Sequence, residues 1–267
     1  MDLGLAGKVC AVTGASRGIG RDVALRLAAE DAHVVLVGRN EERLRAATGV
    51  CQAEGAGGAV PLRLDVTDPD AGERMLDTAT AELGQLDVLV NNAGTAVWRD
   101  LDDLTDADWL DAWELNVMAP MRAMRAAIPP MAGRGWGRVV NVSSTAGKRP
   151  SANMAEYSVA KAGELALSRL YADRHAASGV LVNAVAPGPV KSELWMDEGG
   201  LLDQSLELAG ASSRDAALKA AGSKRPIGRL AEVGEIAAAI VFLCSEQASY
   251  VAGAAWSVDG GTVQVII

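Results

Sequence analysis

The sequence predicts one α/β domain built on a doubly wound, seven-stranded parallel sheet with helices on both faces. Two observations predict this fold. Short runs rich in β-branched residues alternate with longer helical patterns along the whole chain, as repeated β-α-β units do. The apolar runs are nearly continuous, which is typical of strands buried on both faces. With 49% hydrophobic and 22% charged residues, the 267-residue chain has the composition of a folded protein, and we expect one domain over residues 1–267.

The elements follow one another in a regular order. The predicted strands are Lys8–Thr13, His33–Val37, Val60–Asp65, Leu86–Asn91, Arg138–Ser143, Val180–Ala186 and Ala255–Val258. The predicted helices, mostly bounded by Gly, Pro or Asp, are Gly18–Asp31, Glu41–Glu54, Asp70–Leu83, Asp106–Met131, Ala155–Ser178 and Glu232–Glu246. The stretch from Pro187 to Pro226 is too long for a plain connection, and its apolar residues predict a helical substrate lid over a pocket, at about 189–225.

Charge and composition exclude several classes of partner. The net charge of −9 argues against nucleic acid or an anionic membrane surface, because both require a concentrated basic face. The strongly apolar run Ile236–Cys244 is far shorter than the roughly 20 residues of a membrane-spanning helix. Residues 1–7 lack the basic and apolar regions of a signal peptide, so we expect a cytoplasmic protein.

Cysteine and histidine usage predicts neither a disulfide framework nor a metal site. The three cysteines, Cys10, Cys51 and Cys244, are odd in number and widely scattered, and we expect them to be buried reduced thiols. The two histidines, His33 and His175, lack a zinc-type spacing. No metal is therefore predicted.

A glycine-rich loop follows the first strand and opens the first helix. In the stretch from Thr13 to Gly20, Gly14 permits a tight turn, and Gly18 and Gly20 allow close backbone approach to a pyrophosphate at the helix N-terminus. No Gly-Lys-Ser/Thr follows, so a P-loop nucleotide triphosphatase is not expected. Taken alone, the loop is also compatible with a flexible strand-to-helix turn.

The end of the second strand indicates which dinucleotide binds. Dinucleotide sites that take NAD usually carry a carboxylate there, which accepts hydrogen bonds from the ribose hydroxyl. This chain has Gly38 and then Arg39, and Arg39 together with Arg17 can bind a 2′-phosphate. The sequence therefore favours NADP(H). The alternative is that Arg39 and Arg43 form only the solvated face of the next helix.

Polar side chains converge at the carboxyl edge of the predicted sheet. Tyr157 and Lys161, four residues apart, share one face of a helix, and a nearby ammonium favours the phenolate form of a tyrosine. Ser144 lies 13 residues before Tyr157 at the end of a strand, and the strand ending at Asn91 reaches the same edge. This arrangement suits acid–base chemistry on a ligand bound at that edge.

The chain resembles the short-chain dehydrogenase/reductase family, which has the Rossmann fold, over essentially its whole length. The motifs that carry the resemblance are Thr13-Gly14-x-x-x-Gly18-Ile19-Gly20, Asp65-Val66, Asn91-Asn92-Ala93-Gly94, Asn116, Ser144, Tyr157-x-x-x-Lys161, Pro187-Gly188 and Asp259-Gly260-Gly261. The pattern is most similar to 3-oxoacyl-carrier-protein reductases. One departure is Asp31, where relatives often have Gly at the end of the first helix.

This resemblance implies a role for each matched catalytic residue. Tyr157 would transfer the proton, Ser144 would bind the developing oxyanion, and Lys161 would hold the nicotinamide ribose and favour the phenolate of the tyrosine. Asn116 corresponds to the asparagine that holds a water in a proton relay to the lysine, although a helix asparagine bonded to backbone is the plainer interpretation. Ser143 is the alternative to Ser144.

The residues expected at the cofactor come from the glycine-rich loop, from the end of the second strand and from the motifs shared with the family. They are Gly14, Ser16, Arg17, Gly18, Ile19, Gly20, Arg39, Asp65, Val66, Asn92, Ala93, Gly94, Tyr157, Lys161, Pro187, Gly188, Val190 and Ser192.

The sequence thus predicts an NADPH-preferring oxidoreductase that interconverts a ketone and a secondary alcohol. A catalytically silent NADP-binding regulator and an S-adenosylmethionine methyltransferase are the alternatives, and the second leaves the Tyr/Lys pair without a function. Trp98 and Trp195 suggest a partly hydrophobic ketone, although packing explains them equally well. A carrier-bound 3-oxoacyl thioester is one candidate substrate, and sugar, steroid and xenobiotic ketones stay open. Basic residues that could meet an acidic carrier protein are Arg122, Arg125, Arg134, Lys148, Arg149 and Arg174.

The assembly is also expected from resemblance. Relatives are commonly homotetramers joined through the two long helices after the fourth and fifth strands and through the last strand. The apolar tail Val263–Ile267 fits a buried terminus at such a contact.

Overall fold

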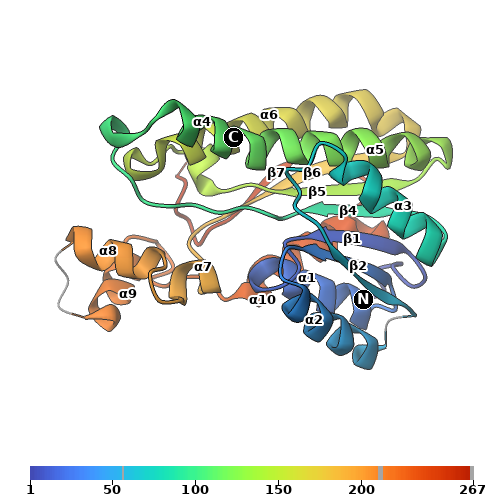
Figure 1. Cartoon of the computed structure of the whole chain (residues 1–267), viewed down its shortest axis with the longest axis horizontal. Helices are drawn as coiled ribbons and strands as arrows, with labels where there is room; N and C mark the ends of the chain where they lie inside the picture. The colour runs from blue at the N-terminus through green and yellow to red at the C-terminus, as the bar shows by residue number, and fades with distance from the viewer. Residues whose placement is uncertain (56, 210–212, 265–267) are drawn as a thin grey trace.

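The computed structural model describes residues 1–55, 57–209 and 213–264, and its centre is a seven-stranded parallel sheet (Figure 1). The strand order is β3-β2-β1-β4-β5-β6-β7, with all six neighbouring pairs parallel. The strands are β1 (Val9–Thr13), β2 (His33–Gly38), β3 (Ala59–Arg63), β4 (Val88–Asn91), β5 (Gly137–Val142), β6 (Val180–Pro187) and β7 (Ala255–Val258). The order reverses between β1 and β4, and this is the switch point at which doubly wound sheets bind ligands.

Helices cover both faces of the sheet (Figure 1). One face carries α1 (Gly18–Ala29), α2 (Glu41–Glu54) and α10 (Val233–Cys244), which bury a core of aliphatic side chains against the sheet. The other face carries α3 (Ala71–Leu83), α5 (Ala119–Gly133) and α6 (Ala155–His175) over a second core, and α4 (Asp106–Trp113) packs against α6. The central strands β1, β4, β5 and β6 are buried throughout, as their continuous apolar sequences predict.

The helix expected over Asp106–Met131 is interrupted. The structure has α4, a π-helical turn η2 (Glu114–Met118) and then α5. Pro120 has no backbone N–H and cannot donate to the carbonyl of Asn116, so regular α-helical bonding fails there. The N–H of Ala119 bonds instead to the Glu114 carbonyl, one residue further back than in an α-helix.

The segment between β6 and α10 contains the expected helices of a lid. They are α7 (Glu193–Met196), α8 (Leu201–Ala209) and α9 (Arg214–Ser223), and they project beside the carboxyl ends of the strands (Figure 1). Residues 210–212 of the expected lid and 265–267 of the apolar tail lie outside the described residues. Short 3₁₀ turns complete the chain: η1 (Leu101–Asp103), η3 (Thr145–Gly147), η4 (Ala152–Met154), η5 (Ala176–Ser178) and η6 (Glu246–Ala248).

The first helix ends in a left-handed residue. Asp31 has φ +58°, a conformation that glycine adopts without strain, and its N–H closes the helix on the Ala28 carbonyl. The departure noted in the sequence therefore lies at a position that requires positive φ.

Cys10, Cys51 and Cys244 are buried and unpaired, which confirms the expectation of buried thiols. Burial raises the pKa of the Cys244 thiol to about 12. Among the described residues, no helix is long and apolar enough to cross a membrane. Within the same ranges, no cluster of three or more His, Cys, Asp or Glu side chains could hold a metal ion.

Candidate active site

The glycine-rich loop leaves β1 and enters α1 with its glycines in the conformations that the sequence requires. Gly14 and Gly18 have φ of +66° and +56°. Gly20 serves a different purpose, because a Cβ atom there would lie 2.3 Å from Asn92 Nδ2 and 2.5 Å from the Gly14 carbonyl oxygen. Gly20 thus lets α1 approach the loop closely, and it does not itself line the cavity.

Arg17, in the middle of this loop, has a partner in the lid. Its Nη1 lies 3.3 Å from Asp197 Oδ2, and both side chains are about half exposed. The pair joins the loop that would bind phosphate to the end of α7.

The end of β2 presents a basic side chain to the cavity. Arg39 Nη1 lies 3.7 Å from Asp65 Oδ2, and 81% of the Arg39 side chain is exposed. Partial burial alone would raise the pKa of Asp65, but hydrogen bonds from Thr67 and the charge of Arg39 hold that pKa below its usual value. Arg43, in the first turn of α2, also lines the cavity. Two cations and one carboxylate are therefore among the residues that line the cavity after β2 and β3.

The predicted catalytic residues lie at the carboxyl ends of β4 and β5. Ser144, Tyr157 and Lys161 line one cavity, and Lys161 Nζ lies 5.8 Å from the centre of the Tyr157 ring. The Ser144 hydroxyl faces this cavity and accepts a hydrogen bond from the N–H of Ala146. Ser143 also lines the cavity, but its hydroxyl is buried and donates to the Lys161 carbonyl oxygen at 3.0 Å. The geometry favours Ser144 as the serine that meets a ligand.

Asn116 lies in the π-helical turn just behind the cavity. Its Nδ2 donates to the Ala112 carbonyl at 2.8 Å, which matches the plainer interpretation, a helix asparagine bonded to backbone. Its buried Oδ1, however, accepts no hydrogen bond from the residues that the structure describes. A Cβ atom on Gly94 would lie 3.4 Å from this oxygen and 3.8 Å from Lys161 Nζ, so the glycine leaves space between them. An unpartnered buried oxygen is costly, and a relay water would satisfy it.

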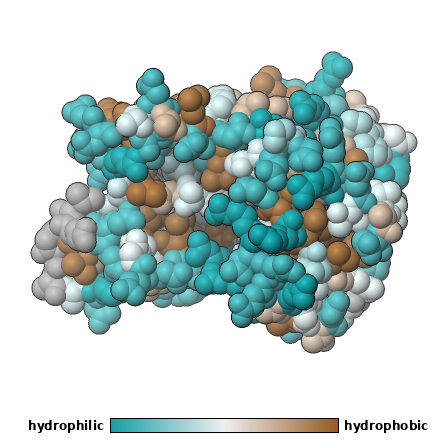
Figure 2. Space-filling model, viewed as in Figure 1, coloured by the Kyte–Doolittle hydropathy of each residue, from teal (hydrophilic) through white to brown (hydrophobic). Residues whose placement is uncertain are grey.

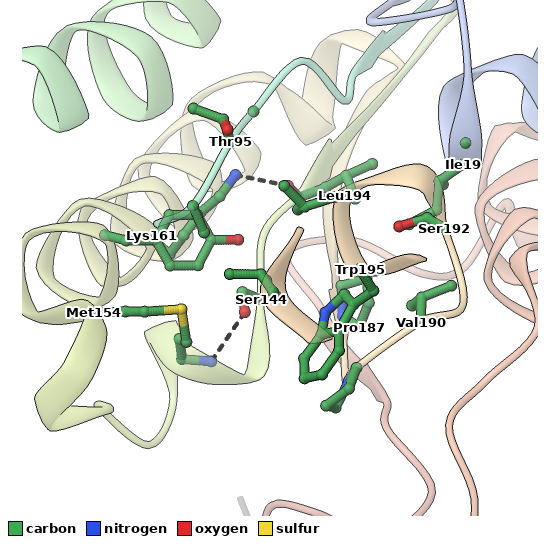
Figure 3. A pocket seen from close by; sticks show the side chains of 18 of the residues that line it. Ile19, Thr95, Ser144, Met154, Lys161, Pro187, Val190, Ser192, Leu194 and Trp195 are labelled. Atoms are coloured by element: carbon green, nitrogen blue, oxygen red, sulfur yellow. Dashed lines mark hydrogen bonds between the residues drawn. The ribbon is translucent and has the colours of Figure 1, made fainter. Parts of the chain in front are cut away.

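The cavity is large enough for a dinucleotide together with a substrate. Its volume is about 1450 Å³, whereas sites for one small molecule usually take about 300–1,000 Å³. In Figure 3, Ser144 and Lys161 lie across from the lid residues Leu194 and Trp195. The space-filling view shows the same hollow between lid and sheet, with hydrophobic side chains inside it (Figure 2).

Most of the residues predicted for the cofactor line this cavity. They are Gly14, Ser16, Arg17, Gly18, Ile19, Arg39, Asp65, Val66, Asn92, Ala93, Gly94, Tyr157, Lys161, Pro187, Gly188, Val190 and Ser192. Gly20 was also predicted for the cofactor but does not line the cavity, and neither does the predicted catalytic residue Asn116.

Of the six basic residues suggested for a carrier protein, only Arg149 lines the cavity. Arg134 bonds to the Leu86 carbonyl, at the opposite end of the sheet, and Arg122 pairs with Glu114. Two cavity-lining cations were missed, Lys224 and Arg225, because they follow α9 in a region with no recognisable motif.

Trp98 and Trp195, which the sequence suggested for the substrate side, both line the cavity. Their ring centres lie 6.3 Å apart in an edge-to-face contact. Leu194 and Met154 line the same cavity, with Met154 on the side of Ser144 and Lys161 (Figure 3). Met154 was not predicted, because it lies in the short turn η4 before α6, where the sequence has no recognisable motif.

Comparison with known proteins decides the family. A family model described as Enoyl-(Acyl carrier protein) reductase matches residues 14–263. The 3-oxoacyl-(acyl-carrier-protein) reductase FabG of Escherichia coli strain K12 is 35% identical over 264 residues, which are 97% of this chain and 98% of the relative. The chain belongs to the short-chain dehydrogenase/reductase family. It is therefore an oxidoreductase that acts on CH–OH or C=O groups.

Two further relatives differ in what they act on. The cis-4-hydroxycyclohexanecarboxylate dehydrogenase of Sinomonas cyclohexanicum is 41% identical over 261 residues, covering 97% of each chain. The L-sorbose reductase of Gluconobacter frateurii, solved with NADPH and L-sorbose, superposes with a TM-score of 0.92 at 33% identity and covers both chains fully. This likeness confirms the doubly wound fold of the family.

Proposed function

We propose that the chain is an NADPH-dependent ketone reductase that also runs in the alcohol-oxidising direction. The observation that carries the proposal is that Ser144, Tyr157 and Lys161 line one cavity with the glycine-rich loop. A regulator that only binds the nucleotide would not need a tyrosine, a lysine and a serine at the substrate end of that cavity.

The cavity fits NADP(H) on structural grounds. The turns at Gly14 and Gly18 lead into the N-terminus of α1, which can bind a pyrophosphate, and Arg39 lines the cavity and can supply the cation that a 2′-phosphate requires. When bound, NADPH supplies the hydride for the carbonyl carbon. The L-sorbose reductase was solved with NADPH, which supports this choice.

Four side chains of the protein would perform the rest of the reaction. The Tyr157 hydroxyl donates its proton to the carbonyl oxygen in reduction and, as phenolate, takes a proton from the alcohol in oxidation. The Ser144 hydroxyl donates a hydrogen bond to the oxygen on which negative charge develops. The Lys161 ammonium, 5.8 Å from the Tyr157 ring centre, stabilises the phenolate that remains after proton transfer. The Asn116 Oδ1 can accept a hydrogen bond from a water that returns a proton to this group of residues.

A phenylalanine variant tests this role of Tyr157. Tyr157→Phe should still bind NADPH and lose nearly all ketone reduction, by at least about 100-fold. Tyr171→Phe is the matched control, because Tyr171 is on the same helix α6 and does not line the cavity. Turnover in Tyr157→Phe equal to that in the control would overturn the mechanism, and a wild type that binds NADPH without reducing any ketone would favour the regulator.

For the substrate, we propose a ketone with a mainly hydrophobic body. Trp98, Trp195, Leu194 and Met154 supply apolar walls for it. The FabG relative favours a 3-oxoacyl thioester as the first compound to test.

A second candidate substrate class is a cyclic alcohol that carries a carboxylate. Arg149, Lys224 and Arg225 line the cavity and would complement such an anion. The 41% identical relative is named for cis-4-hydroxycyclohexanecarboxylate. Steady-state kinetics with NADP⁺ and this alcohol, and with NADPH and a 3-oxoacyl N-acetylcysteamine thioester, separates the two classes by their kcat/KM values.

We also propose that the protein is a homotetramer and works in the cytoplasm. Leu110 and Trp113 on α4 and Leu170 on α6 are exposed apolar residues on two helices that pack together, which supports an assembly face there. Light scattering at micromolar concentration tests the assembly, and Leu110→Asp combined with Leu170→Asp should lower the measured mass. A monomeric wild type would contradict this part of the proposal.

A further inference from the structure

The catalytic lysine has a buried carboxylate as its partner. Lys161 Nζ lies 2.9 Å from Glu164 Oε2, and the two side chains are 3% and 1% exposed. The residues are three apart on α6, so both project from one face of the helix. An ion pair removed so completely from water requires close geometry and further hydrogen bonds.

Neighbouring groups fix the ammonium of this pair. Lys161 Nζ also donates to the Val142 carbonyl at 2.8 Å, so two of its three protons are engaged on the inner wall of the cavity. The Ser143 hydroxyl bonds to the Lys161 backbone, and Ser168 bonds to the Glu164 backbone. The Glu164 carboxylate is therefore buried behind the catalytic centre, with the fixed Lys161 ammonium as its hydrogen-bond donor.

The charges around the pair explain how each partner affects the other. Burial alone would lower the pKa of Lys161, but the Glu164 carboxylate, with Tyr157, raises that pKa above its usual value. Burial raises the pKa of Glu164, against the smaller opposing effects of Lys161 and Ser143. Without Glu164, the cost of burying the ammonium would be much less compensated.

Other charged groups on neighbouring elements have partners elsewhere or lie apart from the pair. Glu114 on η2 pairs with Arg122 on α5, Asp108 on α4 with Arg99, and Arg138 on β5 with Glu246. The remaining charged residues on elements packed against α6 are Asp106 and Asp111 on α4 and Arg125 on α5. Among the described residues, none of these charged groups lies within salt-bridge distance of Lys161 or Glu164.

We propose that Glu164 is a positioning residue that keeps the Lys161 ammonium charged and fixed against the inner wall of the active-site cavity. The consequence for catalysis rests on the proposed reductase function, whereas the effect on Lys161 does not. The role explains why a carboxylate is buried on the inner face of α6, where it would otherwise only destabilise the fold.

Glu164→Gln tests the proposal, because glutamine keeps an acceptor oxygen and removes the charge. The chain has six lysines, so ¹⁵N-lysine labelling with NMR detection of the ammonium groups can follow Lys161, whose signal is the one lost in Lys161→Met. In Glu164→Gln the titration midpoint of Lys161 should fall by at least about one pH unit. Asp173→Asn is the matched control, since it removes a carboxylate from an exposed pair on the same helix and should leave the midpoint unchanged.

Activity supplies the second readout. The alkaline limit of ketone reduction in Glu164→Gln should move to lower pH together with the Lys161 midpoint, and Glu164→Asp should restore most of it. An unchanged midpoint overturns the proposal even when the wild type reduces ketones. A shifted midpoint in a protein without reductase activity supports the pair and refutes the proposed function instead.

If Glu164→Gln does not fold, a second pair of variants still tests the proposal. In that case Glu164→Leu is compared with the double variant Lys161→Met/Glu164→Leu, which removes both charges. Recovery of folding in the double variant alone supports the pair, and equal failure of both variants overturns it.

Discussion

Replacement of Arg39 by alanine should weaken NADPH binding far more than NADH binding. Arg39 follows β2 and lines the cavity next to Asp65, with 81% of its side chain exposed. Because the Arg39–Asp65 pair is exposed and 3.7 Å long, its loss should cost the fold no more than about 1 kcal/mol. The variant should therefore remain folded, and its effect can be assigned to the cofactor.

The expected magnitude follows from the bond that is lost. A charge-assisted hydrogen bond from a guanidinium to a phosphate contributes about 1.5–3 kcal/mol, so the Kd for NADPH should rise roughly 10- to 150-fold. Asp65 then loses its cationic neighbour and adds repulsion toward the phosphate. NADH carries a hydroxyl at that position and should lose at most about two-fold.

Calorimetric titration of NADPH and NADH into wild type, Arg39→Ala and Arg45→Ala measures this discrimination. Arg45 is the control, because it is exposed on α2, pairs with Glu41 and does not line the cavity. The preference for NADPH should shrink as salt increases, since the site is open to solvent. Equal weakening of both cofactors, or a wild type that prefers NADH, would refute the assignment of Arg39.

Three further outcomes are expected. Asp31→Gly relieves a φ of +58° and should raise stability by about 1 kcal/mol and Tm by about 2–4 °C in a thermal melt, whereas a lower Tm would contradict the strain assigned to this residue. Gly20→Ala places a Cβ 2.3 Å from Asn92 Nδ2 and should cost about 1–3 kcal/mol in denaturant unfolding while weakening NADPH binding; normal values of both would show that the loop adapts. Asp197→Asn frees Arg17 from an exposed pair 3.3 Å long and should strengthen NADPH binding by up to about five-fold in calorimetry, and a loss of affinity would mean that the pair organises the loop instead.

The sheet could be predicted because each strand is indicated by its own short run of apolar residues. Continuous β-branched runs such as Val180–Ala186 can be buried only in a two-sided layer, and the structure places β6 there, ending one residue later. The phosphate loop could be predicted for a similar reason. Gly14 and Gly18 adopt positive φ angles, which favour glycine, so the residue type itself indicates the turn.

The interrupted helix and the charge behind the catalytic centre could not be predicted in the same way. A 3.6-residue period continues through η2, so only Pro120, four residues after Asn116, indicates the break. In the sequence, Glu164 cannot be distinguished from an exposed helix glutamate. Its burial follows from the packing of α6 against the sheet, which depends on the three-dimensional structure. Lys224 and Arg225 line the cavity because of how the lid folds, and no motif or residue spacing in the sequence predicts that arrangement.

The edge-to-face contact of Trp98 and Trp195 gives the protein an optical signal of its own. The two indoles come from segments nearly a hundred residues apart, and their ring centres are 6.3 Å from one another at the wall of the cavity. A ketone that enters beside them changes the polarity and the neighbours of both rings. A change in intrinsic fluorescence that is lost in Trp98→Phe or Trp195→Phe, while the other four tryptophans remain, can therefore report the filling of the substrate side without a label and without turnover.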